Sequence, residues 1–339
     1  MSFKSVFILL FSLVFLLKNE HITAQNTATK TMQTNLIQPP FLKPGDTVAI
    51  VAPSGVLKNR TDEVGRSKAI LESWGLKVVI GKHVFSKNGH FAGTDDERCE
   101  DFQKALNDPS IKAIWAARGG YGTVRILDKL DYTQFKKNPK WIIGYSDITA
   151  LHNQLHNLGY ETIHAMMCTS LTKDESEVKE AIDTFKDAIF GKQLSYQLKG
   201  SSYNKTGTVT APLVGGNLTV LHTMLGSKTS IDTSGKIIFL EEVGEYAYHI
   251  DRMLQSMKRA GYFEDCAGIL VGDISRVRYN DQDFGRSIEE IFLDIVSDKN
   301  IPVAFNMPAG HEKDNRAMIL GTNVTMKVGK DGSSVVFGN

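Results

Sequence analysis

Three residues that could act as a nucleophile, a general base and an orienting carboxylate lie at the ends of apolar segments in this 339-residue sequence, and Ser146 is the first. It follows the apolar run "WIIG" and precedes a helix-like segment that begins at Asp147. Such a corner projects a hydroxyl clear of the backbone, as in a nucleophile elbow, although the usual G-x-S-x-G becomes Gly-x-Ser-Asp-x-Thr here. Ser146 is equally compatible with a helix-capping role that involves no chemistry. A nucleophilic role therefore requires a general base elsewhere in the chain.

A histidine and a glutamate could complete the set. His311 closes the apolar segment "IPVAFNMPAGH", which predicts a strand that ends in a turn, and a structural histidine in that turn is the alternative. The apolar segment "KIIFLEE" ends in Glu241 and Glu242. A carboxylate so close to a buried strand requires an ion-pair or hydrogen-bond partner, or has a functional role. A carboxylate can orient an imidazole base. A carboxylate at this position can instead cap a helix or form an ion pair with Arg252. Glu242 and Glu245 fit these two structural roles better than Glu241 does.

The segment "ARGGYG" offers groups that could stabilise negative charge. It lacks the Lys-Ser/Thr of a P-loop and the full spacing of a dinucleotide-binding loop. The bare glycines Gly119 and Gly120 would let their backbone N–H groups approach a substrate carbonyl, so an oxyanion hole shared with the Asp147 N–H is as plausible as a phosphate site. Arg118 could bind a substrate carboxylate in bidentate fashion.

Two further histidines, His152 and His156, have the i, i+4 spacing of a zinc-binding motif. The segment "HNQLH" lacks the glutamate of that motif, so we expect both side chains on the exposed face of the helix after Ser146.

The elements that must position these residues alternate between strands and helices. Apolar runs at residues 46–52, 76–81, 111–117 and 141–144 predict strands, and amphipathic segments between them predict helices, one of them opened by a capping box of Thr94 and Glu97. Such alternation is typical of a parallel sheet covered on both faces, with ligands at the carboxyl ends of its strands. A second α/β domain with mixed strand directions is predicted after a polar segment around residues 171–204.

Composition narrows the class of protein. Hydrophobic residues make up 42% of the chain and charged residues 23%, as in a globular protein with a substantial core. The net charge is +1 with no long basic run, which argues against a nucleic-acid partner. The three cysteines have neither disulfide nor zinc-site spacing. We interpret residues 1–24 as a cleavable signal peptide and 25–42 as a linker; an uncleaved membrane anchor is the alternative.

The ordered set "APSG", "RGGYG", "GYSDIT", "LVGGNLTVL", "FLEEVGE…IDRML", "GILVGD" and "MPAGH" resembles the LD-carboxypeptidase family, serine peptidases of the S66 type. The resemblance runs from about residue 43 to the C-terminus. It implies a flavodoxin-like domain at 43–168, an inter-domain segment at 169–205 and a swivelling, β-barrel-like α/β domain at 206–339.

The same resemblance assigns roles. It implies Ser146 as nucleophile, Glu241 as the acid and His311 as the base, an oxyanion hole at Gly119, Gly120 and Asp147, and no metal or organic cofactor. For substrate binding we expect the side chains Arg118, Tyr121 and Asn217. The implied substrate is a muropeptide or peptidoglycan stem peptide that loses its terminal D-alanine. A homodimer is expected from the family alone, and export to the periplasm from the signal-like N-terminus.

Two other functions stay open. The family's other branch cleaves peptidyl-nucleotide antibiotics of the microcin type, and nucleobase binding favours a stacking aromatic. No tryptophan follows Trp141, which argues against that branch, although Phe185 or Tyr203 could stack. A non-catalytic cell-wall peptide-binding protein is the third hypothesis. Labelling of Ser146 by a serine-directed phosphonate would separate it from an enzyme.

Overall fold

The computed structural model describes residues 36–282 and 284–338. The predicted signal peptide, residues 1–24, lies outside the described residues, as does most of the predicted linker. Within the described ranges, no helix is both long enough and apolar enough to cross a membrane.

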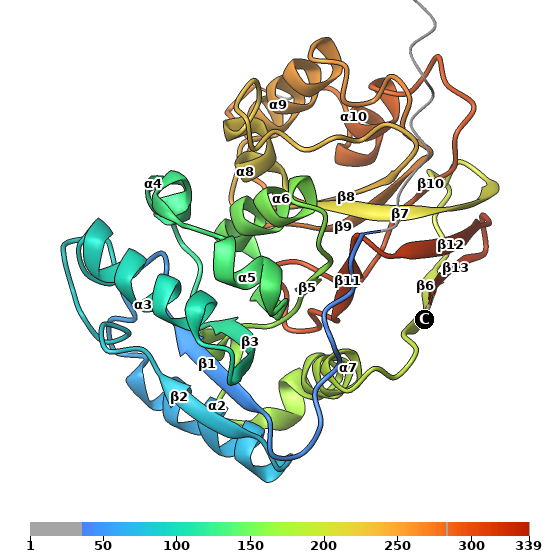
Figure 1. The fold of residues 1–339 in the computed structure, drawn as a ribbon. Helices are drawn as coiled ribbons and strands as arrows, with labels where there is room; N and C mark the ends of the chain where they lie inside the picture. Colours follow the sequence, from blue (N-terminus) through green and yellow to red (C-terminus); the bar gives the residue numbers. More distant parts are fainter. Residues whose placement is uncertain (1–35, 283, 339) are drawn as a thin grey trace, which may run out of the picture. The chain divides into compact units, whose positions relative to one another are not determined.

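The first of two sheets has six strands in the order β11-β5-β4-β3-β1-β2 (Figure 1). Its strands are β1 (Thr47–Val51), β2 (Lys77–Ile80), β3 (Ile111–Ala116), β4 (Trp141–Gly144), β5 (Thr162–His164) and β11 (Met318–Leu320). The first five run parallel, whereas β11 pairs with β5 in the antiparallel direction. The late strand β11 therefore joins the N-terminal sheet, so the polypeptide after His311 is held against β5.

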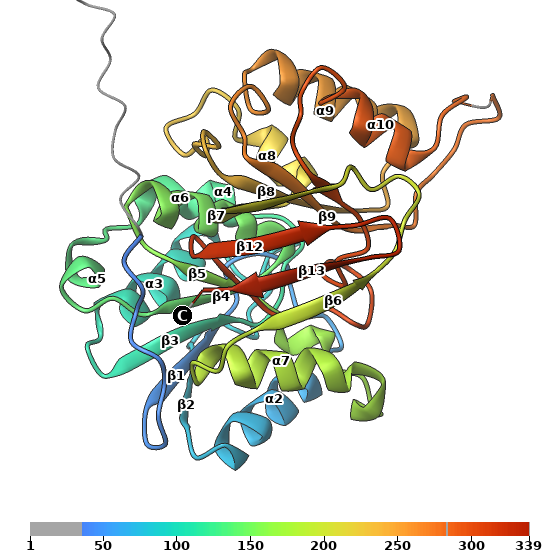
Figure 2. The same ribbon diagram turned by 90° about the vertical axis from the view of Figure 1, so that its right-hand side faces the viewer.

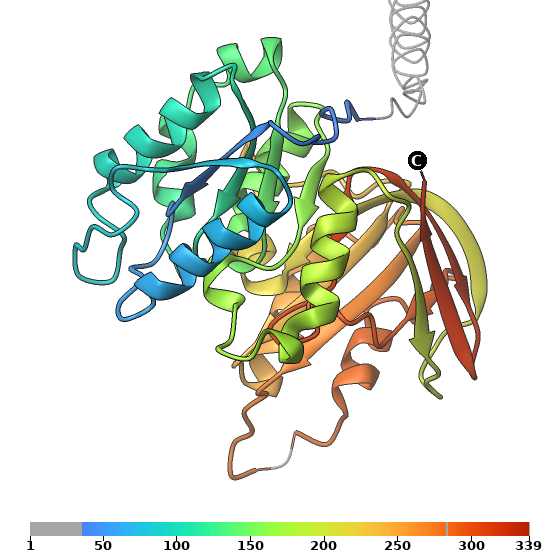
Figure 3. The ribbon, with the colours of Figure 1, turned by 90° about the horizontal axis from the view of Figure 1, so that it is seen from below.

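Helices cover both faces of this sheet, which explains why its strands are apolar without alternation. The helices are α2 (Thr61–Ser73), α3 (Asp95–Asn107), α4 (Thr123–Ile126), α5 (Thr133–Lys137), α6 (Thr149–Asn157) and α7 (Lys179–Ile189). Alternate residues of β1 enter different cores: Ala49 and Val51 pack with α3, α5 and α6, while Val48 and Ile50 pack with α2 and α7. Helices α2 and α7 lie side by side (Figures 2 and 3), and Trp74 contacts Phe185 edge-on. The predicted capping box at the start of α3 is confirmed.

The second sheet has seven strands in the order β10-β9-β8-β7-β12-β13-β6. Its elements are β6 (Ser195–Lys199), β7 (Gly207–Asn217), α8 (Leu218–Thr223), β8 (Ile237–Val243), α9 (Ala247–Arg259), β9 (Gly268–Ser275), α10 (Ile288–Asp294), β10 (Val303–Ala304), β12 (Asn323–Val328) and β13 (Gly332–Phe337). Strands β7 to β10 are parallel, and the remaining pairs are antiparallel. A bridge between Lys205 and Val303 brings the β6–β7 connection against the opposite edge strand, so the sheet curls toward itself.

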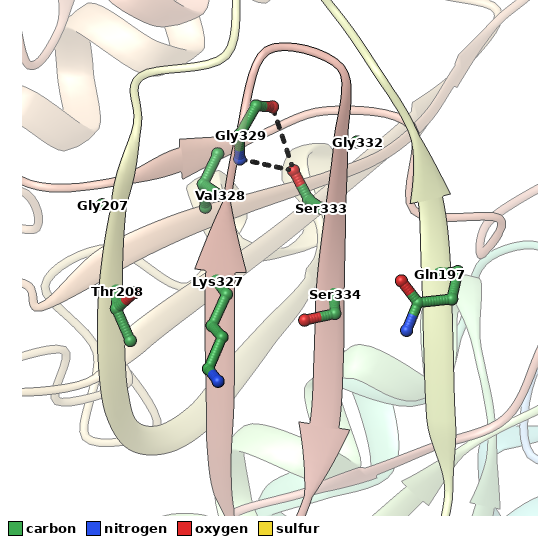
Figure 4. Close-up of a pocket in the computed structure, with 9 residues that line it drawn as sticks. All are labelled: Gln197, Gly207, Thr208, Lys327, Val328, Gly329, Gly332, Ser333 and Ser334. Atoms are coloured by element: carbon green, nitrogen blue, oxygen red, sulfur yellow. Dashed lines mark hydrogen bonds between the residues drawn. The ribbon is translucent and has the colours of Figure 1, made fainter.

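One face of the antiparallel half of this sheet is polar. Figure 4 shows the side chains of Thr208, Lys327, Ser334 and Gln197 in a row across β7, β12, β13 and β6, in the order that the strand register dictates. The apolar residues that alternate with them, such as Met326 and Val335, are fully buried. This alternation is the signature of a sheet with one face on the core. No residue predicted for catalysis lines the hollow in Figure 4.

The predicted fold class, a parallel α/β domain followed by a mixed α/β domain, is confirmed. Details at the segment boundaries differ. The end of the predicted linker packs on the folded body, since Phe41 stacks on Trp141 and the Leu42 N–H bonds to the Ile189 carbonyl. Strand β6 arises inside the predicted inter-domain segment. The strand predicted to end at His311 is wrong, because β10 has two residues and a loop follows it.

Candidate active site

Ser146 occupies a strained corner between β4 and α6. Its φ is +62°, in the left-handed region that a non-glycine residue enters only when its surroundings require it. A Cβ added to Gly144 would lie 2.8 Å from Ile148 Cγ1, so only glycine fits before the corner. The N-cap position of the short 3₁₀ helix Ser146–Ile148 belongs to Tyr145, and Ser146 makes no capping hydrogen bond. The alternative of a capping serine therefore does not hold.

Glu241 lies inside β8 at an irregularity in the sheet. The register between β8 and β9 shifts between Leu240 and Glu242, so Leu240 faces Val271 while Glu242 faces Ile274. Such a bulge changes the direction of nearby side chains. The two glutamates consequently have different hydrogen-bond partners. Glu241 reaches His311, whereas Glu242 accepts a hydrogen bond from the Thr219 N–H at 2.8 Å, at the start of α8. The capping alternative is thus correct for Glu242 and wrong for Glu241.

His311 lies on the loop between β10 and β11, and hydrogen bonds on both sides hold that loop. The Gly310 N–H donates to Asn315 Oδ1 at 3.0 Å, and the Glu312 N–H donates to Asp273 Oδ2 at 3.2 Å. Asn315 Oδ1 also lies 3.0 Å from His164 Nε2 at the end of β5. The buried amide therefore links the His311 loop to the sheet that carries Ser146.

The three side chains form a continuous relay. His311 Nδ1 is 2.7 Å from Glu241 Oε2, and His311 Nε2 is 3.1 Å from Ser146 Oγ. A carboxylate only accepts hydrogen bonds, so the proton on Nδ1 faces Glu241 and the lone pair of Nε2 faces the serine hydroxyl. Glu241 is fully buried and the His311 side chain is 16% exposed. This arrangement can take a proton from Ser146 and stabilise the resulting imidazolium.

The pKa of His311 is raised. Burial lowers it, but the charge of Glu241 and its hydrogen bond raise it more, with a smaller contribution from Glu242. The nearby cation Arg276 acts in the opposite sense. Arg276 is exposed at the end of β9 and, like Ser146, has a positive φ, of +53°. Sequence analysis did not single out this residue.

The predicted oxyanion hole has its glycines in place. A Cβ on Gly119 would lie 3.1 Å from Ser146 Cβ and 3.2 Å from its Oγ, so the absence of a side chain is what allows the close approach. The Gly119 carbonyl accepts from the Gly55 N–H at 3.0 Å, which fixes the loop. The Asp147 side chain accepts from the Thr123 N–H at 2.8 Å. This hydrogen bond ties the Asp147 carboxylate to the start of α4.

Two of the three predicted substrate-binding residues line the cavity beside Ser146, and the third does not. Tyr121, which is 48% exposed, and Asn217 line a cavity of about 250 Å³ together with Ser146. Asn217 also caps α8, since its Oδ1 accepts from the Val220 N–H. Arg118 does not line this cavity, and its guanidinium donates to the Val56 carbonyl oxygen instead. The expectation that Arg118 binds a carboxylate beside Ser146 therefore fits the structure poorly.

Several other expectations are wrong. His152 and His156 are buried, with His152 Nε2 3.0 Å from the Gly144 carbonyl oxygen, because α6 packs against β7 and α8 as well as its own sheet. Phe185 is in the core against Trp115, so it is unavailable to stack on a nucleobase. Arg252 lies over the Tyr248 ring, and its predicted pairing with a glutamate is absent from the described residues.

Comparisons with known proteins identify the family of this chain. Residues 48–165 match the family model of the LD-carboxypeptidase N-terminal domain, and residues 210–326 match that of the LD-carboxypeptidase C-terminal domain. A Bacillus subtilis protein named probable murein peptide carboxypeptidase is 33% identical over 293 residues, which are 85% of this chain and 91% of that protein. The chain belongs to the LD-carboxypeptidase family. The prediction of the family is thereby confirmed.

Two solved structures have folds similar to that of this chain. The muramoyltetrapeptide carboxypeptidase from Oxalobacter formigenes has a TM-score of 0.77 and 27% identity, covering 86% of this chain and 99% of its own. The protein MccF in complex with glutamyl sulfamoyl guanosine has a TM-score of 0.78 at 22% identity, covering 89% and 98%. At that identity the second likeness concerns the fold alone.

Proposed function

We propose that this protein is a serine LD-carboxypeptidase that removes the terminal D-alanine from a murein tetrapeptide. The observation that carries the proposal is the relay from Ser146 through His311 to Glu241, with Ser146 Oγ 3.1 Å from its base. Membership of the LD-carboxypeptidase family and relatives named for murein peptides support the substrate class.

The proposed reaction has two stages. Ser146 Oγ attacks the carbonyl that precedes D-alanine while His311 Nε2 takes its proton, and Glu241 stabilises the imidazolium. Backbone N–H groups at Gly119, Gly120 and Asp147 face the developing oxyanion. His311 returns the proton to the departing amine, so that D-alanine leaves and an acyl-enzyme remains. Water, activated by the same imidazole, then hydrolyses the ester and regenerates Ser146.

Release of D-alanine tests the proposal. Purified protein is incubated with the tetrapeptide L-Ala-γ-D-Glu-meso-diaminopimelate-D-Ala, and mass spectrometry follows the free amino acid and the tripeptide. We expect both products from the wild type, and a loss of at least about 10³-fold in Ser146→Ala, since removal of a triad member leaves only the contributions of binding and the oxyanion hole. Full activity of Ser146→Ala would overturn the mechanism.

The same preparation distinguishes the two other hypotheses. A microcin-type peptidase would release the amino acid from an aminoacyl sulfamoyl nucleoside and leave the tetrapeptide intact. A binding protein would retain the tetrapeptide unchanged. The cavity beside Ser146 contains no tryptophan, phenylalanine or histidine, and Tyr121 supplies its aromatic ring.

Two further parts of the proposal concern the cell. We propose export to the periplasm, on the strength of the apolar run after Lys4, and assembly as a homodimer, as expected from the family. Fractionation of cells that express the full chain tests the first, and light scattering of the purified protein tests the second. A full-length protein in the cytoplasm or a monomer at all concentrations would contradict them.

A further inference from the structure

A buried arginine, Arg98, joins the loop that approaches Ser146 to a neighbouring loop. It is the fourth residue of α3, and its side chain is fully buried. Its guanidinium donates to the Pro53 carbonyl oxygen, in the loop after β1. It also donates to the Gly122 carbonyl oxygen, in the loop after β3, at 2.9 Å. One side chain therefore connects the carboxyl ends of two neighbouring strands of the first sheet.

The position of this cation is unfavourable for the fold by itself. The N-terminus of a helix is the positive end of the helix dipole, which disfavours an arginine there. A charge removed from water also requires a partner. Asp95 pairs with Arg98, but its oxygens also lie 3.0 and 2.8 Å from Nε and Nη2 of Arg125. Because two cations share this carboxylate, ion pairing alone does not account for the burial of Arg98.

The two loops pack backbone against backbone. A Cβ on Gly122 would lie 2.8 Å from Arg98 Nη1, so the absence of a side chain admits the guanidinium. The Gly55 N–H donates to the Gly119 carbonyl oxygen at 3.0 Å, and a Cβ on Gly55 would lie 2.9 Å from that oxygen. The loop with the predicted oxyanion donors is thus fixed to its neighbour at Gly119 directly and at Gly122 through Arg98.

The residues next to the two bound carbonyl groups extend the connection to the corner of Ser146. Ser54 Oγ and Thr123 Oγ1 are 2.7 Å apart, and both side chains are fully buried. The Thr123 N–H donates to Asp147 Oδ2 at 2.8 Å. Displacement of the segment that Arg98 binds would consequently reach both sides of the predicted oxyanion hole.

We propose that Arg98 is a positioning residue for catalysis, which holds the backbone N–H groups of Gly119 and Gly120 in place for the developing oxyanion. The inference rests on the proposed carboxypeptidase function and adds a residue to its machinery. Arg98 does not line the cavity beside Ser146, so it acts on the transition state through the loops and not on the substrate. Its planar guanidinium presents donors to two carbonyl groups in a fixed geometry that an ammonium group does not reproduce.

Two substitutions of Arg98 test the inference by the release of D-alanine from the diaminopimelate tetrapeptide. Arg98→Met should lower kcat about 100-fold, with KM changed less than about threefold, because a displacement of about 1 Å at a catalytic site costs about that factor. Arg98→Lys keeps the charge beside Asp95 but offers a single ammonium group, and it should lower kcat about tenfold. Asp95 retains Arg125 as a partner in both variants.

Lys140→Met is the matched control. Lys140 is a buried cation of the same domain and, like Arg98, donates to two backbone carbonyl groups. These are the carbonyl groups of Ala105 and Asp108, at 2.9 and 2.6 Å, near the C-terminus of α3. Its loss should lower the melting temperature, measured by circular dichroism, and leave kcat within about twofold of the wild type.

A boronate inhibitor separates positioning from a general loosening of the site. The inhibitor is the tripeptide product with a boronic acid in place of the carboxyl group of its third residue. Ser146 Oγ adds to boron as its proton passes to His311, and the tetrahedral adduct places an oxygen where the oxyanion develops. In Arg98→Met the inhibition constant of the boronate should rise about 100-fold. That of the unmodified tripeptide, which forms no adduct, should change less than about threefold.

The outcomes separate this inference from the proposed function. An unchanged kcat in Arg98→Met, an equal rise in the two inhibition constants, or an equal loss of kcat in Lys140→Met would overturn the positioning role and leave the carboxypeptidase intact. If Arg98→Met does not fold, Arg98→Lys carries the same comparisons. A wild type that releases no D-alanine would refute the proposed function itself.

Discussion

Replacement of Glu241 by glutamine perturbs the relay at its buried end. The change keeps the shape of the side chain but removes the charge 2.7 Å from His311 Nδ1. The glutamine amide can also present a donor to Nδ1, which would favour the imidazole tautomer that cannot accept from Ser146. The variant therefore tests both functions of the carboxylate at once.

The size of the effect follows from the geometry. Two unit charges 2.7 Å apart attract by about 6 kcal/mol at an effective dielectric constant of about 20. Both groups are largely buried, and the cost of desolvation offsets part of this attraction. We take about 4 kcal/mol as the net stabilisation of the imidazolium. At about 1.4 kcal/mol per factor of ten, kcat should fall about 10³-fold.

The pH dependence gives an independent readout. In the wild type, burial lowers the pKa of His311, but the charge of Glu241 and its hydrogen bond raise that pKa by more. Its neutral form, which acts as base, is lost as the pH falls through that pKa, so kcat/KM should decline on the acid side from above pH 6.5. Without the Glu241 charge the acid limb should move to lower pH. Steady-state release of D-alanine between pH 5 and pH 9 measures both changes.

The kcat and the pH profile of Glu241→Gln can also refute the proposed role of Glu241. A fall in kcat smaller than about tenfold with an unmoved acid limb would show that Glu241 neither orients nor charges His311. Glu161→Gln is the matched control, because Glu161 is another buried carboxylate and bonds to Gln38, outside the relay. Its kcat should stay within about twofold of the wild type.

Two further predictions concern the supports of the site. Asn315→Ala removes the acceptor of the Gly310 N–H and should lower kcat about 10- to 100-fold with little change in KM, since each buried donor left unpaired costs about 1–3 kcal/mol. Asn306→Ala, on the same loop but bonded to Lys199 and Gly200, should leave kcat unchanged, and equal losses in both variants would contradict a positioning role for Asn315. Burial raises the pKa of Glu161 to about 7, so its contribution to stability is lost as the pH rises from 4.5 through 7. Glu161→Gln should therefore raise the free energy of unfolding by about 2–3 kcal/mol at pH 9 and by little at pH 4, measured by urea denaturation, and a destabilised variant at pH 9 would contradict this.

The regular parallel elements could be predicted because their residues specify them locally. The β-branched strand at residues 47–51 and the capping box of Thr94 and Glu97 each depend on near neighbours in the sequence. Strands β6 and β13 were not predicted, although each alternates polar with apolar residues, which is the local pattern of a half-buried strand. The pairing of β6 with β13 joins segments far apart in the sequence, and neither segment specifies it alone.

The candidate site was predicted in part for a similar reason. Ser146, Glu241 and His311 each follow an apolar run, and the structure brings them into hydrogen-bonding distance. The supports of the site had no local signal. Asn315 and His164, which are 151 residues apart in the sequence, meet because β11 pairs with β5. Neither segment alone predicts this pairing.

The burial of His152 and His156 illustrates the same limit. Helix α6 carries polar residues around most of its circumference, which is typical of an exposed helix. In the structure it is enclosed between its own sheet and elements of the second domain. Burial accordingly lowers the pKa of His152 to about 4, which keeps it neutral beside the corner that carries Ser146.

Stoichiometric labelling of the nucleophile tests the central claim most directly. The wild-type protein is treated with a fluorophosphonate, and intact mass and peptide mapping locate the adduct. The relay predicts one adduct per chain on Ser146, none in Ser146→Ala, and a labelling rate reduced at least about 100-fold in His311→Ala. An adduct on another residue, or undiminished labelling of Ser146 in His311→Ala, would contradict a serine nucleophile activated by His311.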